Sequence, residues 1–240
     1  IGIFFGQCTN KSIEKSNLTS SDILAIGSHG QTIWHSPLGS APYSWQIGNP
    51  SIITARTLIS TVSDFRNLDM AFGGQGAPLV PAFHSAFLGE SNRSRIVLNI
   101  GGIANISILD KESSMAIGYD TGPGNCLMDL WHQLHTGEQY DKGGASARAG
   151  EILPELLERF LEEDFFRKEG PKSTGRETFN LDYINSAIKS VGNRENFSPE
   201  DIQATLLELT VVSIASNIHV LKPHNIKDIY LCGGGGANIF

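Results

Sequence analysis

Hydrophobic residues gather along the chain in short runs that end in glycine, a pattern typical of buried strands followed by tight turns. The segment Arg95–Gly102 reads RIVLNIGG, and positions 103–110 then alternate between apolar and polar residues. Two such runs joined through a glycine pair predict a β-hairpin, and positions 115–120 predict a third strand. Shorter strands are expected over 44–48 and 61–66, and short buried strands over 23–26 and 228–232.

Longer segments carry apolar residues at helical spacing. Positions 49–60 predict a helix with Pro50 in its first turn, and positions 201–221 predict the longest helix, with Ser198 as N-cap and Pro199 at N1. Mixed strands and helices of this kind predict an α/β protein with two lobes, and the polar run 91–95 is the candidate boundary. Further helices are expected over 125–135 and 152–166 and in a segment that ends near Gly89, whereas residues 1–21 are interpreted as polar and turn-rich.

Composition narrows the class of protein. Of the 240 residues, 40% are hydrophobic and 18% are charged, as in a globular domain, and the net charge is 18 − 25 = −7. Because nucleic-acid-binding faces are basic, we expect no nucleic-acid partner. Three distant cysteines indicate a reducing, cytoplasmic setting. No apolar run approaches the roughly 20 residues that span a bilayer, so we expect no membrane partner either.

Three glycine-rich turns follow apolar strands, and they are the first candidates for a ligand site. Backbone N–H groups in such turns can approach phosphate oxygens closely. Any single turn is more often structural, but three of them at strand ends favour a binding site. Neither the P-loop pattern nor GxGxxG is present. The turns are Gly101-Gly102, Gly122–Gly124 and Gly233–Gly236.

Asp120 ends a predicted strand directly before a glycine turn. A carboxylate held there could take a proton from a nucleophile in phosphoryl transfer, and it could equally cap the next turn. Arg66, at the end of another predicted strand, could clamp an anion or form a structural ion pair.

Other polar residues also allow two interpretations. His29 lies beside a glycine turn, where a structural hydrogen bond is commoner than catalysis. The pair His132 and His135 has helical spacing that a metal could use, yet no third ligand is nearby, so no metal ligand is assigned. The polar loop PKSTGRE, Pro171–Glu177, could form a lid, contact an anion or be solvated.

Taken together, the motifs resemble those of a known family. VLNIGGIANISIL and LCGGGGAN resemble the phosphate hairpin and the adenosine turn of the sugar kinase, Hsp70 and actin superfamily. Within it, SHGQTIWH, DFRNLDMAFGGQGAPLVPAFH, GYDTGPGN and PKSTGRE are similar to the anhydro-N-acetylmuramic acid kinase family, in family order from about Gly27 to Asn238. The resemblance implies a two-lobed actin-like ATPase (ribonuclease H-like) α/β fold.

The resemblance also implies a reaction and a set of site residues. The reaction hydrolyses the 1,6-anhydro bridge of anhydro-N-acetylmuramic acid and phosphorylates O6, with ATP and Mg²⁺, in cell-wall recycling. Asp120 matches the general base, and Thr32 and Arg66 match residues of the sugar pocket. A homodimer is left open. The residues expected to contact ATP are Asn99, Gly101, Gly102 and Asn105 on the hairpin, and Gly233, Gly234, Gly235 and Gly236 at the adenosine turn.

The sequence departs from the family pattern in one respect. Residues 1–28 contain nothing like the family's GTSxDGxD turn, and the chain ends soon after the adenosine turn. We therefore expect a chain truncated at both ends, with residues 1–92 as the remainder of the first lobe and 93–240 as the second. Because catalysis would draw on both lobes, we expect weak or no activity from this chain alone. The alternatives are another sugar or acyl kinase of the superfamily, or a non-catalytic sugar or nucleotide sensor.

Overall fold

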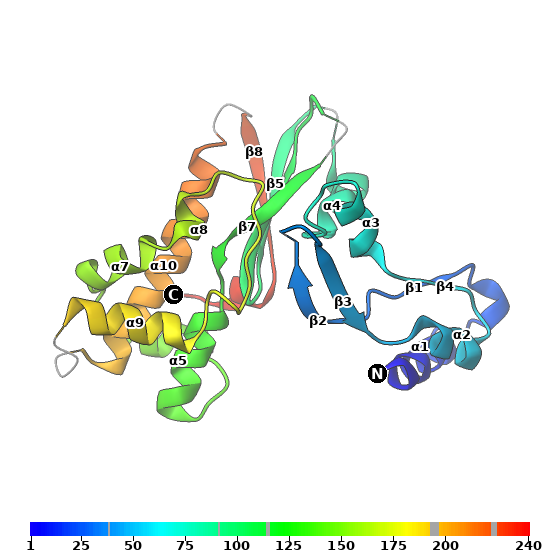
Figure 1. The fold of residues 1–240 in the computed structure, drawn as a ribbon, viewed down its shortest axis with the longest axis horizontal. Coiled ribbons are helices and arrows are strands. Elements are labelled where there is room, and N and C mark those ends of the chain that lie inside the picture. Colours follow the sequence, from blue (N-terminus) through cyan, green and yellow to red (C-terminus); the bar gives the residue numbers. More distant parts are fainter. Residues whose placement is uncertain (38, 91, 114–115, 193–196, 222–224) are drawn as a thin grey trace. The chain divides into compact units, whose positions relative to one another are not determined.

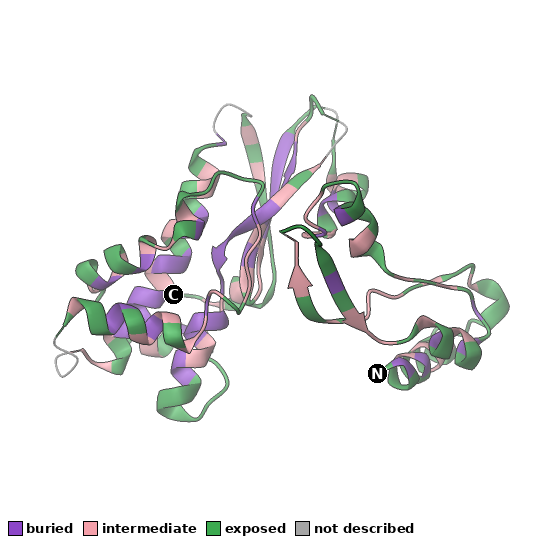
Figure 2. Cartoon of the chain, in the orientation of Figure 1, coloured by how far each residue is buried: buried purple, intermediate pink, exposed green. Residues whose placement is uncertain are grey.

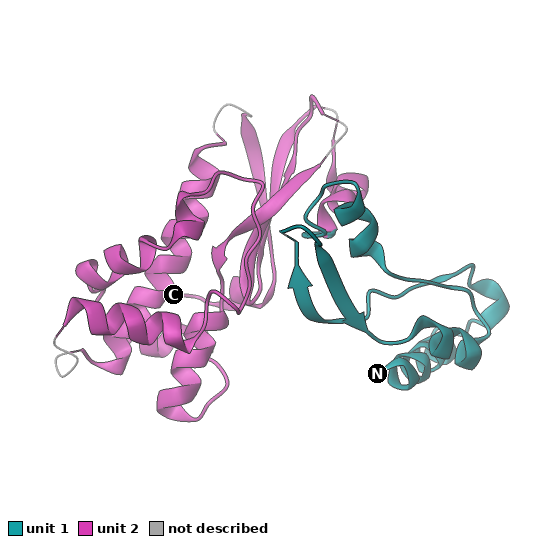
Figure 3. Cartoon of the chain, viewed as in Figure 1, with its two compact units in different colours: residues 1–79 teal, residues 80–240 magenta. Residues whose placement is uncertain are grey.

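The computed structural model of the chain describes residues 1–240 except 38, 91, 114–115, 193–196 and 222–224 (Figure 1). The chain divides into two units, residues 1–79 and 80–240 (Figure 3). Helix α4, Val80–Leu88, thus belongs to the second unit. The assignment of lobes to 1–92 and 93–240 stays a prediction, and Ser91 and Met115, which the sequence placed in a boundary and a strand, lie outside the described residues.

The first unit combines short helices with two small sheets. Strand β2 (Gln31–Ser36) pairs antiparallel with β3 (Tyr43–Ile47), as expected for 44–48. Strand β1 (Ile26–Gly27) pairs parallel with β4 (Thr61–Val62). The expected buried strand over 23–26 is wrong in its bounds and burial, since Leu24 is 97% exposed. The helices are α1 (Gly2–Lys15), η1 (Ser20–Asp22), α2 (Pro50–Thr57) and α3 (Phe65–Ala71).

Helix α1 contradicts the prediction of a turn-rich start. It contacts α2 through glycine: a β-carbon on Gly2 would lie 3.0 Å from the carbonyl oxygen of Asn49, and one on Gly6 would lie 3.1 Å from Cβ of Arg56. Its apolar Phe4 is 62% exposed instead. Because the buried face consists of glycines, the spacing of apolar residues does not reveal this helix.

The second unit contains a four-stranded sheet in the order β7-β6-β5-β8. Strands β5 (Ser94–Ile100), β6 (Ile103–Leu109) and β7 (Ile117–Pro123) form the expected antiparallel meander, and β8 (Ile226–Cys232) pairs parallel with β5. A meander whose first strand is flanked by a later parallel strand agrees with the expected ribonuclease H-like sheet. One face, including Ile96, Leu98 and Ile106, packs with Ile214 of α10.

Strand β8 corrects the expectation of a buried strand. Ile229, Tyr230 and Leu231 are 51%, 40% and 54% exposed. Figure 2 shows the difference between this strand and the largely buried meander. The apolar composition correctly predicts a strand here. Its burial is not predicted, because β8 lies at the edge of the sheet and a local sequence does not specify the position of a strand in a sheet.

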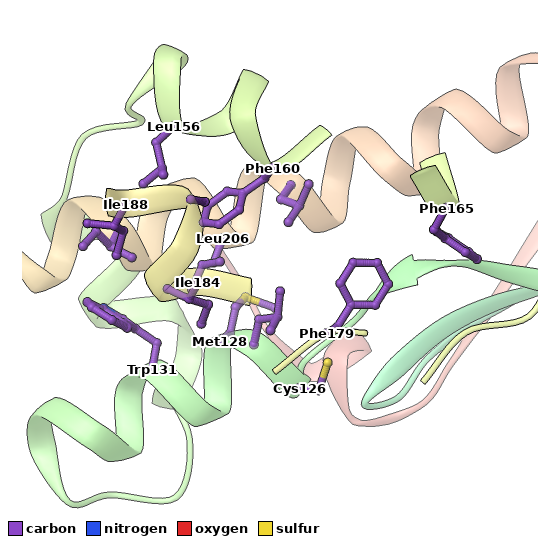
Figure 4. Packing of buried hydrophobic residues seen from close by; sticks show 14 residues of the cluster. Cys126, Met128, Trp131, Leu156, Phe160, Phe165, Phe179, Ile184, Ile188 and Leu206 are labelled. Atoms are coloured by element: carbon purple, nitrogen blue, oxygen red, sulfur yellow. The ribbon is translucent and has the colours of Figure 1, made fainter. Parts of the chain in front are cut away.

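A helical core completes the second unit (Figure 4). Phe160, Leu156 and Ile184 have no exposed side-chain surface and pack with Trp131 and Leu206. Helix α10 begins as predicted, with reciprocal capping bonds between Ser198 and Asp201. The single helix expected over 152–166 is broken at 162–163. The elements are α5 (Cys126–Thr136), η2 (Lys142–Gly144), α6 (Ala145–Ala149), α7 (Pro154–Leu161), α8 (Asp164–Arg167), α9 (Leu181–Val191), α10 (Pro199–His219) and η5 (Gly234–Ala237).

Candidate functional site

The structure brings the three glycine turns of the second unit together. A β-carbon on Gly124 would lie 2.3 Å from the carbonyl oxygen of Gly101. A β-carbon on Gly233 would lie 2.5 Å from the carbonyl oxygen of Ile100, and one on Gly235 would lie 2.9 Å from Oδ1 of Asn125. Backbones approach this closely only where no side chain intervenes. Turns that are distant in the sequence therefore meet at one end of the sheet.

Hydrogen bonds fix the hairpin turn against the start of α5. The N–H groups of Gly124 and Cys126 donate to the carbonyl of Gly102 at 2.9 and 3.0 Å, and the N–H of Asn125 donates to the carbonyl of Gly101 at 2.8 Å. Thr210 of α10 donates its hydroxyl to the carbonyl of Gly124 at 3.1 Å. The Gly101-Gly102 turn is thus held by its carbonyls rather than left as a loose loop.

Polar residues form a row across three adjacent strands of the sheet. Asn99 of β5 pairs in register with Asn105 of β6, and Asn105 pairs with Asp120 of β7. Cross-strand partners share one face of a sheet, so the expected hairpin residues and the expected base lie side by side. Cys232 of β8 continues the row beside Asn99. The site residues of the second unit are therefore brought together by strand register.

Asp120 is buried, at 8% exposed, and two groups of the segment after α8 contact it. Its backbone N–H donates to the carbonyl of Lys172 at 2.9 Å, and its Oδ2 accepts from the N–H of Thr174 at 2.9 Å. Sequence reasoning placed this segment as a lid, an anion contact or a solvated turn, and missed that it holds the carboxylate. The donor is a backbone N–H, which no residue type signals.

Lys172 anchors that segment from inside the protein. Its Nζ donates to the carbonyls of Phe165 and Lys168 at 3.2 and 2.8 Å, and it lies 4.6 Å from the centre of the Phe165 ring. Burial lowers the pKa of Lys172, and the charge of Lys168 acts in the same direction. Lys172 therefore binds the end of α8, and it is not an exposed anion contact.

The last glycine turn lies at the end of β8. Gly233 has φ +87°, a conformation that favours glycine, and a β-carbon there would also lie 2.6 Å from Oδ1 of Asn99. Residues Gly234 to Gly236 belong to η5. Cys232 contacts the same Asn99 side chain at 3.8 Å. The turn therefore packs beside the polar row.

In the first unit, Arg66 lies in the first turn of α3 and not at a strand end as expected. Its Nε donates to Nε2 of His29 at 2.7 Å, and its Nη1 donates to the carbonyl of Gly76 at 2.6 Å. Because Nε2 of His29 accepts, the ring proton is on Nδ1, which lies 3.0 Å from the carbonyl of Gly30. This arrangement agrees with the structural interpretation of His29.

Thr32 lies on β2, where its hydroxyl accepts from Nε2 of Gln46 at 3.1 Å. Thr32 and Arg66 thus bond different residues. Their partners, Gln46 and His29, both line a polar cavity of about 250 Å³ within this unit. Asp64 also lines it and adopts φ +62°, which is uncommon outside glycine. Of the two expected sugar contacts, each bonds a residue that lines the cavity, Thr32 through Gln46 and Arg66 through His29.

Within the described part of the chain, no group of three or more His, Cys, Asp or Glu side chains is placed to hold a metal ion. Nδ1 of His132 lies 3.3 Å from the hydroxyl of Ser146, and the ring of His135 contacts that of Trp131 at a tilt of 46°, with ring centres 4.1 Å apart. Among the helices that the structure describes, none has the length and apolarity needed to cross a membrane.

The sheet order and the converging glycine turns define an α/β protein of the ribonuclease H-like class. Residues 1–240 match the family described as anhydro-N-acetylmuramic acid kinase. The chain belongs to this family.

Individual relatives agree with that family. A protein of this name from Aliivibrio fischeri is 50% identical over 240 residues, which cover 100% of this chain and 64% of the relative. A second, from Sulfurovum sp., is 48% identical and is covered to 65%. The chain therefore spans about two thirds of the length of these relatives. A solved activator of 2-hydroxyisocaproyl-CoA dehydratase from Clostridium difficile, with bound ADPNP, has 13% identity and a TM-score of 0.34, covering 90% of this chain and 80% of that one.

Proposed function

We propose that the chain forms part of an ATP-dependent kinase that opens the 1,6-anhydro bridge of anhydro-N-acetylmuramic acid and phosphorylates O6. The product is N-acetylmuramic acid 6-phosphate, and the reaction belongs to cell-wall recycling in the cytoplasm. Membership of the family supports this proposal. The structural observation that carries it is the row Asn99, Asn105 and Asp120, which lies beside the converging glycine turns.

Asp120 is the proposed general base. It takes a proton from water as the water oxygen bonds to the anomeric carbon. The bond from that carbon to O6 breaks, and O6 then bonds to the γ-phosphorus while ADP leaves. The N–H of Thr174 supports this role, because its 2.9 Å bond to Oδ2 fixes the orientation of the carboxylate. Thr32 and Arg66, in the first unit, stay proposed sugar contacts.

The nucleotide would contact the glycine turns. Gly101 and Gly102 lack side chains, so phosphate oxygens could approach their backbone, and Asn99 and Asn105 offer amide groups on the adjoining strands. Gly233–Gly236 is the proposed adenosine contact. The described residues provide no preformed Mg²⁺ cage. Mg²⁺ commonly binds nucleotide phosphates with only one or two carboxylates, and we assign no step to the metal. A homodimer stays a proposal.

The test compares two proteins in an assay that couples ADP release to an absorbance change, with the anhydro sugar and ATP as substrates. The first is the 240-residue chain. The second is a chimera in which this chain replaces the matching region of the Aliivibrio fischeri relative. We expect turnover by the chimera and weak or no turnover by the chain alone, with the sugar 6-phosphate identified by mass spectrometry. Robust turnover by the chain alone would overturn the expectation of a truncated site.

Variants of the chimera test the general base. Asp120→Asn keeps an oxygen that can accept from Thr174, and we expect kcat to fall at least about 100-fold with little change in sugar affinity. Asp182→Asn is the matched control, because Asp182 is exposed on α9 and contacts no proposed site residue. A folded chimera that binds the sugar yet releases no ADP would instead support the non-catalytic sensor.

A further inference from the structure

The segment Pro171–Arg176 reaches from the proposed base to the glycine hairpin. Thr174 donates to Asp120, as described, and two residues later the guanidinium of Arg176 lies against the hairpin turn. A β-carbon on Gly102 would lie 3.7 Å from Nη2 of Arg176. The same short segment therefore places one group on the carboxylate and another beside the turn where phosphate would bind.

Arg176 has a fixed backbone on both sides. Lys172 anchors the preceding residues at the end of α8. On the following side, the carbonyl of Arg176 accepts from Nδ2 of Asn180 at 3.3 Å, and the buried Phe179 donates its N–H to the carbonyl of Gly175 at 3.1 Å. An arginine on a disordered loop would sample many positions, whereas this hydrogen-bonded backbone keeps the guanidinium close to Gly102.

The guanidinium is available for a ligand. Among the described residues, it forms no ion pair within 4.0 Å and its side chain donates no hydrogen bond. The charge of Arg176 acts on Asp129 and Cys126 of α5, and Glu177 follows it in the chain. Burial raises the pKa of Asp129, and the charges of Arg176 and then His132 oppose that rise. The charge of Arg176 thus influences the pKa of Asp129, but among the described residues the two side chains form no ion pair.

We propose that Arg176 is a phosphate-binding residue that holds the polyphosphate chain of the nucleotide at the Gly101-Gly102 turn. This inference rests on the proposed function and adds a residue to it. A guanidinium can donate two parallel hydrogen bonds to one phosphate group, which a lysine cannot. The absence of a side chain at Gly102 leaves room for that geometry, because a β-carbon there would already touch Nη2.

The test measures binding of inorganic tripolyphosphate to the 240-residue chain by isothermal titration calorimetry. We expect Arg176→Ala to raise Kd at least about 10-fold and Arg176→Lys to recover only part of the affinity. Arg167→Ala is the control, because it removes the same charge from an exposed arginine that pairs with Asp164 on α8. Its Kd should stay within about twofold of the wild-type value. Equal losses in both variants, or unchanged binding by Arg176→Ala, would overturn the proposal.

The same variants distinguish this inference from the proposed function. If tripolyphosphate binding depends on Arg176 but the chimera shows no turnover, the phosphate-binding role of Arg176 is supported and the proposed kinase activity is refuted. Turnover that is insensitive to Arg176→Ala would support the kinase and overturn the role of Arg176. Failure of the wild-type chain to bind tripolyphosphate at millimolar concentration would also overturn it. Circular dichroism of each variant checks that the fold is retained.

Discussion

Gly124 offers a direct test of the way the glycine turns meet. In a Gly124→Ala variant, the new β-carbon would lie 2.3 Å from the carbonyl oxygen of Gly101 and 3.2 Å from the backbone nitrogen of Ala104. Both neighbours are backbone atoms, so no side chain can rotate away. The hairpin turn must move, and the bonds from the N–H groups of Gly124 and Asn125 to that turn must lengthen.

The expected cost follows from these contacts. Overpacking of a tight site typically costs about 1–3 kcal/mol. Weakening two backbone hydrogen bonds costs about 0.5–1.5 kcal/mol each. Alanine also restricts the unfolded chain, which offsets about 0.4–1 kcal/mol. We therefore expect Gly124→Ala to lower the free energy of unfolding of the second unit by about 1–6 kcal/mol.

Urea unfolding followed by tryptophan fluorescence measures this change. The chain has three tryptophans, and Trp131 is the one in the second unit, where it is 6% exposed. In a background with Trp34→Phe and Trp45→Phe, its fluorescence reports this unit alone. With a urea m-value of about 2 kcal/mol per molar, the midpoint should fall by about 0.5–3 M.

Gly101→Ala is the matched control. Its β-carbon would lie 3.5 Å or more from neighbouring atoms, an ordinary contact, and Gly101 does not have a positive φ. We expect its unfolding midpoint to stay close to that of the wild type. Equal midpoints for Gly124→Ala and wild type, or an equal loss in Gly101→Ala, would refute the claim that these turns pack backbone against backbone.

Two further predictions use the buried ionisable groups. The pKa of Lys172 is lowered by burial, so the unfolded chain binds more protons than the folded one between that lowered value and about 10.4, and the native state gains stability as pH rises there. The unfolding free energy of wild type minus that of Lys172→Met should rise from about pH 8 to about pH 10; a constant difference contradicts this. Burial raises the pKa of the Cys126 thiol to about 11, whereas Cys8 is exposed. In native protein, mass spectrometry should find iodoacetamide on Cys8 long before Cys126; equal rates would contradict the burial.

The local sequence pattern was sufficient to predict an element where the segment itself contains the residues that determine its structure. The start of α10 is an example, because Ser198, Pro199 and Asp201 carry the cap within four positions. The strands β5 and β6 were predicted from their apolar runs and the glycine pair between them. Arg66 shows the limit: a short strand and a helix start look alike in TVSDFR, and Asp64 in a left-handed conformation separates them.

Contacts between distant segments were beyond the sequence. The three glycine turns lie together because of the way β7, β8 and α5 pack. The group that donates to Asp120 is a backbone N–H 54 positions later in the chain. The predictions of a turn-rich start and of a buried strand at β8 were wrong for the same reason. In each, the burial of a residue depends on a neighbour that the local pattern does not specify.

The position of Asp120 depends on an irregularity of one residue in β7. Ala104 pairs with Gly122, but the next residue of β6, Asn105, pairs with Asp120, so Thr121 is an extra residue on β7. Without that bulge, the register would place Asp120 opposite Ile106, whose face is the apolar core, because each one-residue shift exchanges the two faces of a strand. Thr121 is fully buried and donates its hydroxyl to the carbonyl of Ala104 at 3.2 Å, which fixes the bulge. A single inserted residue thereby turns a carboxylate from the core toward the polar row and the glycine turns.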